Sequence, residues 1–324
     1  MSNSVFEKLH SDGLIADHTL ENIRKKNSSA LFSIHWELKA LLYIGVMLLS
    51  TGLGILVYKN INTISHQVVL GTIAALTIAC FIWCYKNKLP FSPEKVESSG
   101  AFADYILLLG TLSFLSFVGY LQFQYGVFGD RYGLATFIPM VFLFITAYYF
   151  DHPGILCMAI ANLALWMGVS VTPRSLLENG DFSTEIAIYT YLNLGLFLLL
   201  LAIASKRYHF KKHFSFIYHQ FAVHLTFVAL ISGYSHYSYY PAFIWLIAVA
   251  LAMWFFLTDA LKHKSFYFVL LTVIYSYIAL SIFVVRSLDF LPRYAVTYLY
   301  ILYFIVSGLG LIFTLIYLNR KIKA

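Results

Sequence analysis

The sequence predicts an all-α integral membrane protein, a polytopic bundle of ten transmembrane helices with both termini in the cytoplasm. Three observations predict this fold class: 60% of the 324 residues are hydrophobic, only 11% are charged, and the mean hydropathy is +0.76. An ordinary soluble domain has about 25% charged residues, because a folded globule needs a polar surface. The composition therefore excludes a water-soluble enzyme, a disordered chain and a disulfide-stabilised secreted domain.

Ten apolar stretches are long enough to cross a bilayer. A helix needs about 20 mostly apolar residues to span a hydrocarbon layer of roughly 30 Å. The predicted spans are residues 40–58, 65–85, 102–123, 133–150, 154–171, 185–205, 215–234, 240–259, 265–285 and 294–318.

The basic residues predict how these spans are oriented. With the N-terminus inside, 17 of the 22 Lys and Arg residues fall in cytoplasmic segments and none falls within a span. This asymmetry agrees with the positive-inside rule. The turn Asp151-His152-Pro153 carries no basic residue, so the two spans that it joins escape the test. An eight-span topology, with a re-entrant pair over 133–171, is the alternative.

Residues 1–38 are predicted to form a short amphipathic helical hairpin on the cytoplasmic surface, ahead of a transmembrane domain at 39–324. Val5, Phe6 and Leu9 fall on one helical face, as a surface-lying helix requires. The hairpin either packs on the inner leaflet or docks a protein partner. Because no cleavable signal peptide is visible, the first span is expected to be retained.

The N-terminal region also resembles a known family. The short segment Gly13-Leu14-Ile15 is followed by a glycine-rich first span and by an asparagine just past its outer end. The residues that carry the likeness there are Gly45, Leu48, Leu49, Gly52, Gly54 and Asn60. Over about residues 5–75 the chain is similar to the domain-of-unknown-function 2157 family of predicted bacterial membrane proteins. The resemblance implies a multi-pass protein of the bacterial inner membrane, and it implies no reaction and no catalytic residue.

Polar residues inside the predicted spans are few, and they are the candidates for an intramembrane site. A central charge costs about 2.5–3.5 kcal/mol on insertion scales, so polar groups retained there are functional candidates. They are Asp104, Asn162, Glu185, Asn193, His219 and His224. Each also has a structural interpretation: Asp104 at headgroup level, Glu185 as a helix-start charge that complements the helix dipole, and the Asn and His side chains in interhelical hydrogen bonds. The two histidines are about 140° apart on a helix, so they cannot bind one metal alone.

A proline and two groups of small residues predict where helices bend or pack. Pro139 falls mid-span and predicts a kink or break, a feature that transporters place at substrate sites. Small-residue patches that would allow close helix packing lie in the first and last spans. Their residues are Ser50, Gly52, Gly54, Ser307, Gly308 and Gly310. The three cysteines lie in apolar runs and predict neither a disulfide framework nor a metal site.

The sequence favours three functions, in order. The first is transport or handling of a neutral, lipidic or cationic small molecule, because no Lys or Arg remains within a span to hold a multiply charged anion. The second is a non-catalytic scaffold or sensor that docks a partner through the N-terminal hairpin. The third is a membrane-embedded transferase, to which only the position of His35 points, since no catalytic or cofactor-binding motif is present. Membrane lipids are the expected partners, and nucleic acid is not expected.

Overall fold

The computed structural model describes residues 35–59, 65–96, 100–129, 133–171, 185–237, 240–288 and 293–323, together with residues 10, 15 and 19. This part of the chain contains ten α-helices and no strand, which confirms the predicted all-α class. The hairpin predicted at 1–38 lies almost wholly outside the described residues.

The helices follow the predicted spans, with bounds that agree within five residues. The agreement arises because the bilayer requires a helix of about 20 residues, and each apolar run has about that length. In chain order they are α3 (His35–Lys59), α4 (His66–Asn87), α5 (Ala101–Tyr125), α6 (Gly133–Phe150), α7 (Pro153–Val171), α9 (Glu185–Arg207), α10 (Phe214–His236), α11 (Tyr240–Lys262), α12 (Phe266–Leu288) and α13 (Arg293–Lys323).

Eight of the described helices, all but α3 and α7, are long and apolar enough to cross a membrane. The two others contain shorter apolar segments, Ala40–Gly52 in α3 and Pro153–Gly168 in α7. The chain is therefore an integral membrane protein. The full count of ten spans and the side on which the termini lie remain predictions.

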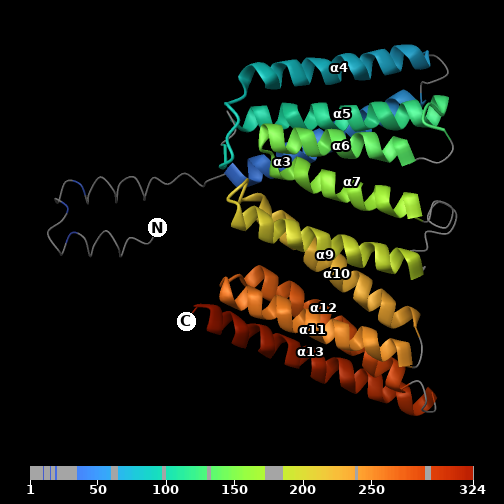
Figure 1. Cartoon of the computed structure of the whole chain (residues 1–324), viewed down its shortest axis with the longest axis vertical. Coiled ribbons are helices and arrows are strands. Elements are labelled where there is room, and N and C mark those ends of the chain that lie inside the picture. Colours follow the sequence, from blue (N-terminus) through green and yellow to red (C-terminus); the bar gives the residue numbers. More distant parts are fainter. Residues whose placement is uncertain are drawn as a thin grey trace. The chain divides into compact units, whose positions relative to one another are not determined.

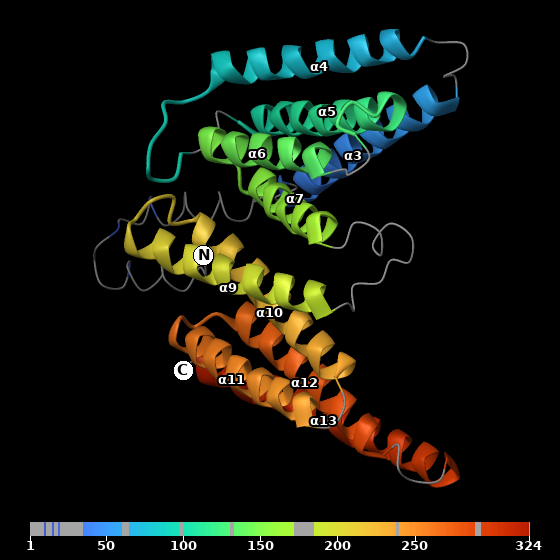
Figure 2. The same ribbon diagram turned by 45° about the vertical axis from the view of Figure 1, so that its right-hand side comes forward.

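The chain divides into two compact units, residues 1–64 and residues 65–324. In the first unit, α3 carries Ser50, Gly52 and Gly54. In the second unit, helices from α4 to α13 lie side by side in nearly chain order (Figures 1 and 2). Helices adjacent in the chain pack as pairs, α4 with α5, α6 with α7, α9 with α10, and α11 with α12.

Helix α10 is at the centre of the second unit. It contacts α7, α9, α11 and α12, and it is the most buried of the candidate spans. Two apolar cores meet on it, one that includes Leu143 and Phe214 and one that includes Phe227 and Val269. Helix α6 runs without interruption through Pro139, which is buried.

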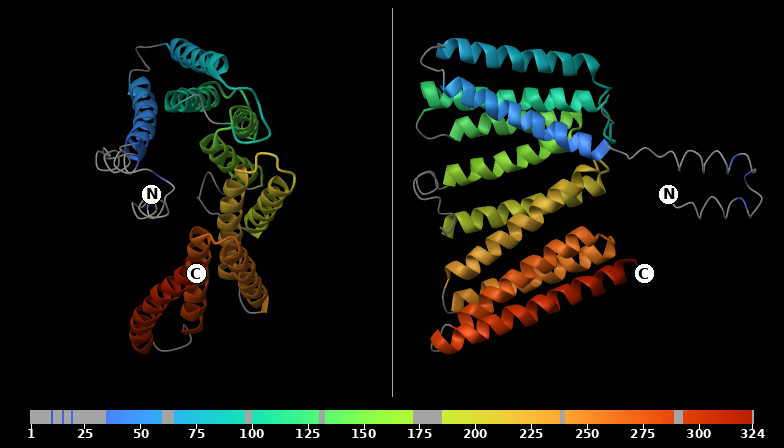
Figure 3. Two further views of the ribbon diagram at one scale, coloured as in Figure 1. Left: turned by 90° about the vertical axis from the view of Figure 1, so that its left-hand side faces the viewer. Right: turned by 180° about the vertical axis from the view of Figure 1, so that it is seen from behind.

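Four connections gather at one end of the second unit, which we name the loop end (Figure 3). They are residues 88–96, 151–152, 208–213 and 263–265. In the predicted topology this end faces the cytoplasm. It positions the charged residues from which the candidate site is built.

Candidate functional site

The polar residues predicted from the sequence do not gather at one place. Asp104 lies in the first turn of α5, at the loop end, and its carboxylate is 4.0 Å from His152 Nε2. Glu185 is exposed at the start of α9, at the opposite end of the unit. Tyr237 directly follows α10 and lies outside the membrane-spanning segment. The Glu185 carboxylate raises the pKa of the Tyr237 phenol above its usual value. Asn193 is exposed along α9.

The deeper candidates are packed between helices. His224 shares a hydrogen bond with the hydroxyl of Tyr275 on α12, with Nδ1 2.7 Å from the oxygen. His219 is buried near Asp259, with Nε2 3.7 Å from Oδ2. Asn162 Oδ1 is buried and has no hydrogen-bond partner among the described residues. These residues therefore share no common polar cavity in the described part of the chain.

The glycines that pack most closely are not those in the predicted patches. A Cβ added to Gly308 or Gly310 would meet no atom within 4 Å, although the neighbouring Ser307 hydroxyl lies 3.1 Å from that of Tyr277. In contrast, a Cβ on Gly195 would lie 2.6 Å from Thr226 Oγ1, because α9 and α10 approach closely there. Gly110 and Gly233 are comparably close to neighbouring helices.

The candidate site is centred on the charged turn between α6 and α7, residues 151–152. Asp151 ends α6 in the left-handed conformation (φ 56°), which Asp tolerates better than most residues. His152 follows, and its Nδ1 accepts a hydrogen bond from the Ile155 N–H at 3.2 Å, which caps α7. Pro153 then begins α7 with its φ already suited to the first helical position. The turn is therefore fixed by local rules.

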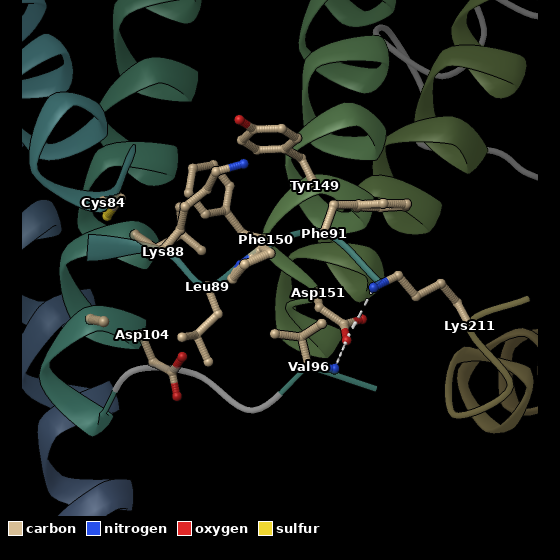
Figure 4. Close-up of a pocket in the computed structure, with 13 residues that line it drawn as sticks. Cys84, Lys88, Leu89, Phe91, Val96, Asp104, Tyr149, Phe150, Asp151 and Lys211 are labelled. Carbon is tan, nitrogen blue, oxygen red and sulfur yellow. Dashed lines mark hydrogen bonds and ion pairs between the residues drawn. The ribbon is translucent and has the colours of Figure 1, made fainter. Parts of the chain in front are cut away.

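Asp151 binds three groups from two other connections of the loop end. Its carboxylate accepts a hydrogen bond from the Val96 N–H at 2.6 Å and lies 3.2 Å from Lys211 Nζ and 2.6 Å from His213 Nε2. Figure 4 shows Asp151 between the Val96 nitrogen and the Lys211 amine. The Asp151 side chain is 2% exposed and that of Lys211 only 1%, so the ion pair is shielded from water.

Lys211 also contacts three residues of the connection at 88–96. Its backbone N–H donates to the Pro93 carbonyl at 2.7 Å, and its Nζ donates to the Glu94 carbonyl at 3.4 Å. The ammonium also lies 4.9 Å from the centre of the Phe91 ring. A buried charge is tolerated only when it is paired and hydrogen-bonded, and Lys211 meets both conditions. The cluster thus ties three connections together.

Asp151 and Lys211 also line a small pocket of about 50 Å³, whose lining is mostly apolar. We name it the polar pocket for the charged and phenolic side chains that it gathers. Its polar lining includes Lys88, Asp104, Tyr149, Asp151 and Lys211, which come from separate helices and connections (Figure 4). Lys88 Nζ lies 3.4 Å above the centre of the Tyr149 ring. On this measure of cavity volume one water needs roughly 10–15 Å³, so the pocket has room for a few waters or one small polar group.

A larger apolar groove of about 570 Å³ lies beside the polar pocket. Helices α4, α5 and α6 form it, and its walls are mostly aromatic and aliphatic. The residues that line it are Thr77, Ile78, Phe81, Ile82, Tyr85, Lys86, Phe114, Phe142, Ile145, Thr146, Tyr149 and Phe150. Tyr149 and Phe150 line both cavities, so the apolar groove and the polar pocket adjoin at these two side chains.

Sequence analysis missed Asp151, Lys211 and His213 as site residues. Lys211 counted there only among the 17 basic residues of the predicted cytoplasmic segments, and Asp151 appeared only in the short turn between two spans. The signal that could have identified Asp151 is its position. It is a carboxylate in a connection of only two residues between two apolar helices, which is too short to form a solvated loop. No comparable signal marks Lys211, because its neighbours in sequence are also basic.

Comparison with protein families agrees with the membrane assignment. Residues 7–156 match the family model "Predicted membrane protein (DUF2157)". The resemblance predicted over the first 75 residues is thus confirmed, and it extends through α6 to the start of α7. The matched region includes Asp104, Asp151 and the walls of the apolar groove, whereas Lys211 and His213 lie outside it. No curated protein and no solved structure matches the chain.

Proposed function

We propose that the chain is a lipid-handling membrane protein, which binds one amphiphile with its acyl chain in the apolar groove and its polar end at the polar pocket. The observation that carries this proposal is that the two cavities adjoin at Tyr149 and Phe150. An apolar slot that ends against charged and phenolic side chains has the polarity profile of a lipid molecule.

The groove suits an acyl chain in size and access. Its volume of about 570 Å³ lies within the range of roughly 300–1,000 Å³ that is usual for small-molecule sites. Ile78 and Ile145, which line it, are 58% and 63% exposed, so the groove is accessible from the hydrocarbon layer. Tyr85 and Lys86 line it near the loop end, and such amphipathic side chains favour the headgroup level.

Lipid handling is favoured over the other functions by the arrangement of the polar residues. Transport through a site at the bilayer midplane would need the intramembrane candidates to converge, whereas Asn193 is exposed on α9 and His224 is bonded to Tyr275. The proposal places the loop end on the cytoplasmic side of a bacterial inner membrane, as the distribution of basic residues favours.

Photo-crosslinking tests the proposal. The purified chain is reconstituted into vesicles that contain a diacylglycerol with a diazirine on one acyl chain, because its polar end is small enough for the polar pocket, and the labelled peptides are mapped after illumination. We expect labels to concentrate on the groove walls, residues 77–86 and 142–150, above the level on other lipid-facing helices. Uniform labelling of all exposed helix faces would contradict the proposal.

A matched pair of variants separates the groove from the general lipid surface. Ile145→Trp fills the groove, whereas Ile247→Trp adds the same bulk to α11, where Ile247 is 61% exposed and lines no groove wall. We expect the groove labels to fall several-fold in Ile145→Trp and to remain unchanged in Ile247→Trp.

A further inference from the structure

A second pocket at the loop end lies on the other side of His213. It encloses about 250 Å³ between the end of α9, the start of α10, the end of α11 and the start of α12. We name it the imidazole pocket, because His213, His219 and His263 all line it. It shares no lining residue with the apolar groove, so a ligand here would bind independently of a lipid in the groove.

The charged residues of the imidazole pocket favour an anion. Lys206 and Lys212 line it and are exposed, while Asp259 is the one carboxylate among the described residues that line it. Asp259 Oδ1 lies 3.3 Å from His263 Nδ1, and that nitrogen is closer, at 3.0 Å, to the backbone carbonyl of Asp259. Among the described residues that line the pocket, two exposed lysines therefore outnumber a single carboxylate.

His219 supplies an unsatisfied polar atom at this pocket. Its side chain is only 7% exposed and packs edge-on against the ring of Phe268, with ring centres 4.4 Å apart. Its Nε2 has no hydrogen-bond partner among the described residues, because Asp259 Oδ2 at 3.7 Å is too far. A buried ring nitrogen without a partner is costly, so a ligand that hydrogen-bonds to Nε2 would be stabilised there.

Two helix starts add partial positive charge. Helices α10 and α12 both begin at the imidazole pocket, and neither has an acidic residue in its first turn. In α10 the N–H groups of Phe214 and Ser215 already donate to the carbonyls of Lys211 and Lys212, at 2.8 and 3.2 Å. The contribution of the helix starts is therefore that of their dipoles, which favour an anion at that end. Within the described residues, no three His, Cys, Asp or Glu side chains are arranged to hold a metal ion.

We propose that the imidazole pocket binds a phosphate group, with Lys206 and Lys212 as its charge partners and His219 Nε2 as a hydrogen-bonding partner. Lysine is a common phosphate ligand and acts there as a point charge. A pocket at headgroup level can receive phosphate from an anionic lipid or from solution. Asp259 weakens the interaction, since its charge repels the phosphate.

Native mass spectrometry of the purified full chain in detergent tests this site. The probes are phosphatidic acid and diacylglycerol with the same acyl chains, which differ only in the phosphate. Both lipids can enter the apolar groove, so we expect phosphatidic acid to show one additional, tighter binding event that diacylglycerol lacks. In Lys206→Gln/Lys212→Gln we expect affinity for phosphatidic acid to fall by roughly fivefold for each lysine lost. The control Arg207→Gln/Lys262→Gln removes the same charge from exposed neighbours and should change affinity less than twofold.

The substitution Asp259→Asn should change the affinity for phosphatidic acid in the opposite direction. For a phosphate site we expect it to strengthen binding of phosphatidic acid, whereas a cation site would lose its ligand. Competition with millimolar inorganic phosphate separates the two sources: displacement of the lipid identifies free phosphate as sufficient, and unchanged lipid binding identifies the lipid as the carrier. Equal binding of diacylglycerol, equal losses in both double variants, or weaker binding in Asp259→Asn would overturn the proposal.

Discussion

The ion pair between Asp151 and Lys211 predicts a large stability cost for one small substitution. Asp151→Asn keeps the shape of the side chain and an oxygen for the Val96 N–H, but it leaves the Lys211 ammonium buried without its counter-charge. At an effective dielectric constant of about 20, unit charges 3.2 Å apart attract by roughly 5 kcal/mol. Removing one partner of a buried pair costs about 3–5 kcal/mol in measured cases. We expect the free energy of unfolding to fall by about that amount.

The assay is unfolding of the purified protein in mixed micelles by titration with sodium dodecyl sulfate, followed by circular dichroism. The matched control is Glu94→Gln, the same change of carboxylate to amide at an exposed position of the loop end, which should change stability by less than about 0.5 kcal/mol. The double variant Asp151→Asn/Lys211→Met removes the stranded charge and should recover much of the loss. Equal stability of Asp151→Asn and Glu94→Gln, or no recovery in the double variant, would refute the account of the cluster.

Two further predictions concern packing and topology. Gly195→Ala should destabilise the protein by about 1–3 kcal/mol in the same assay, because its Cβ would meet Thr226, while Gly310→Ala should be neutral or stabilising by up to about 1 kcal/mol. The reverse order would contradict the close approach of α9 and α10. For topology, Tyr208→Cys at the loop end and Val127→Cys after α5 place a thiol at positions that are 76% and 57% exposed. An impermeant maleimide added to intact cells should label Val127→Cys alone, and labelling of Tyr208→Cys would exclude the predicted orientation.

The fold class and the helices could be predicted because they depend on length and polarity along the chain. An apolar run such as 185–205 specifies a helix, and α9 begins at the predicted residue and ends two residues later. The turn at Pro153 follows equally local rules. Which helix faces pack together could not be predicted. Lipid tails are as apolar as the helix interfaces, so the sequence shows no amphipathic period that would mark the packed face.

The candidate site could not be predicted, because its residues meet only in space. Asp151 and His213 are 62 residues apart, and Lys211 looks like any other basic residue of a cytoplasmic connection. The glycines illustrate the same limit: Gly195 and Gly310 have similar apolar surroundings in sequence, yet only Gly195 lies against another helix. Which helix faces meet is set by the whole bundle rather than by any short segment.

The most direct test of the lipid-handling proposal is an electron cryo-microscopy structure of the chain in lipid nanodiscs. The proposal predicts density for one acyl chain in the apolar groove beside Ile78 and Ile145, stronger than that of surrounding lipid, with its polar end next to Tyr149. A groove that is closed by its own side chains, or filled no better than the rest of the lipid-facing surface, would contradict it.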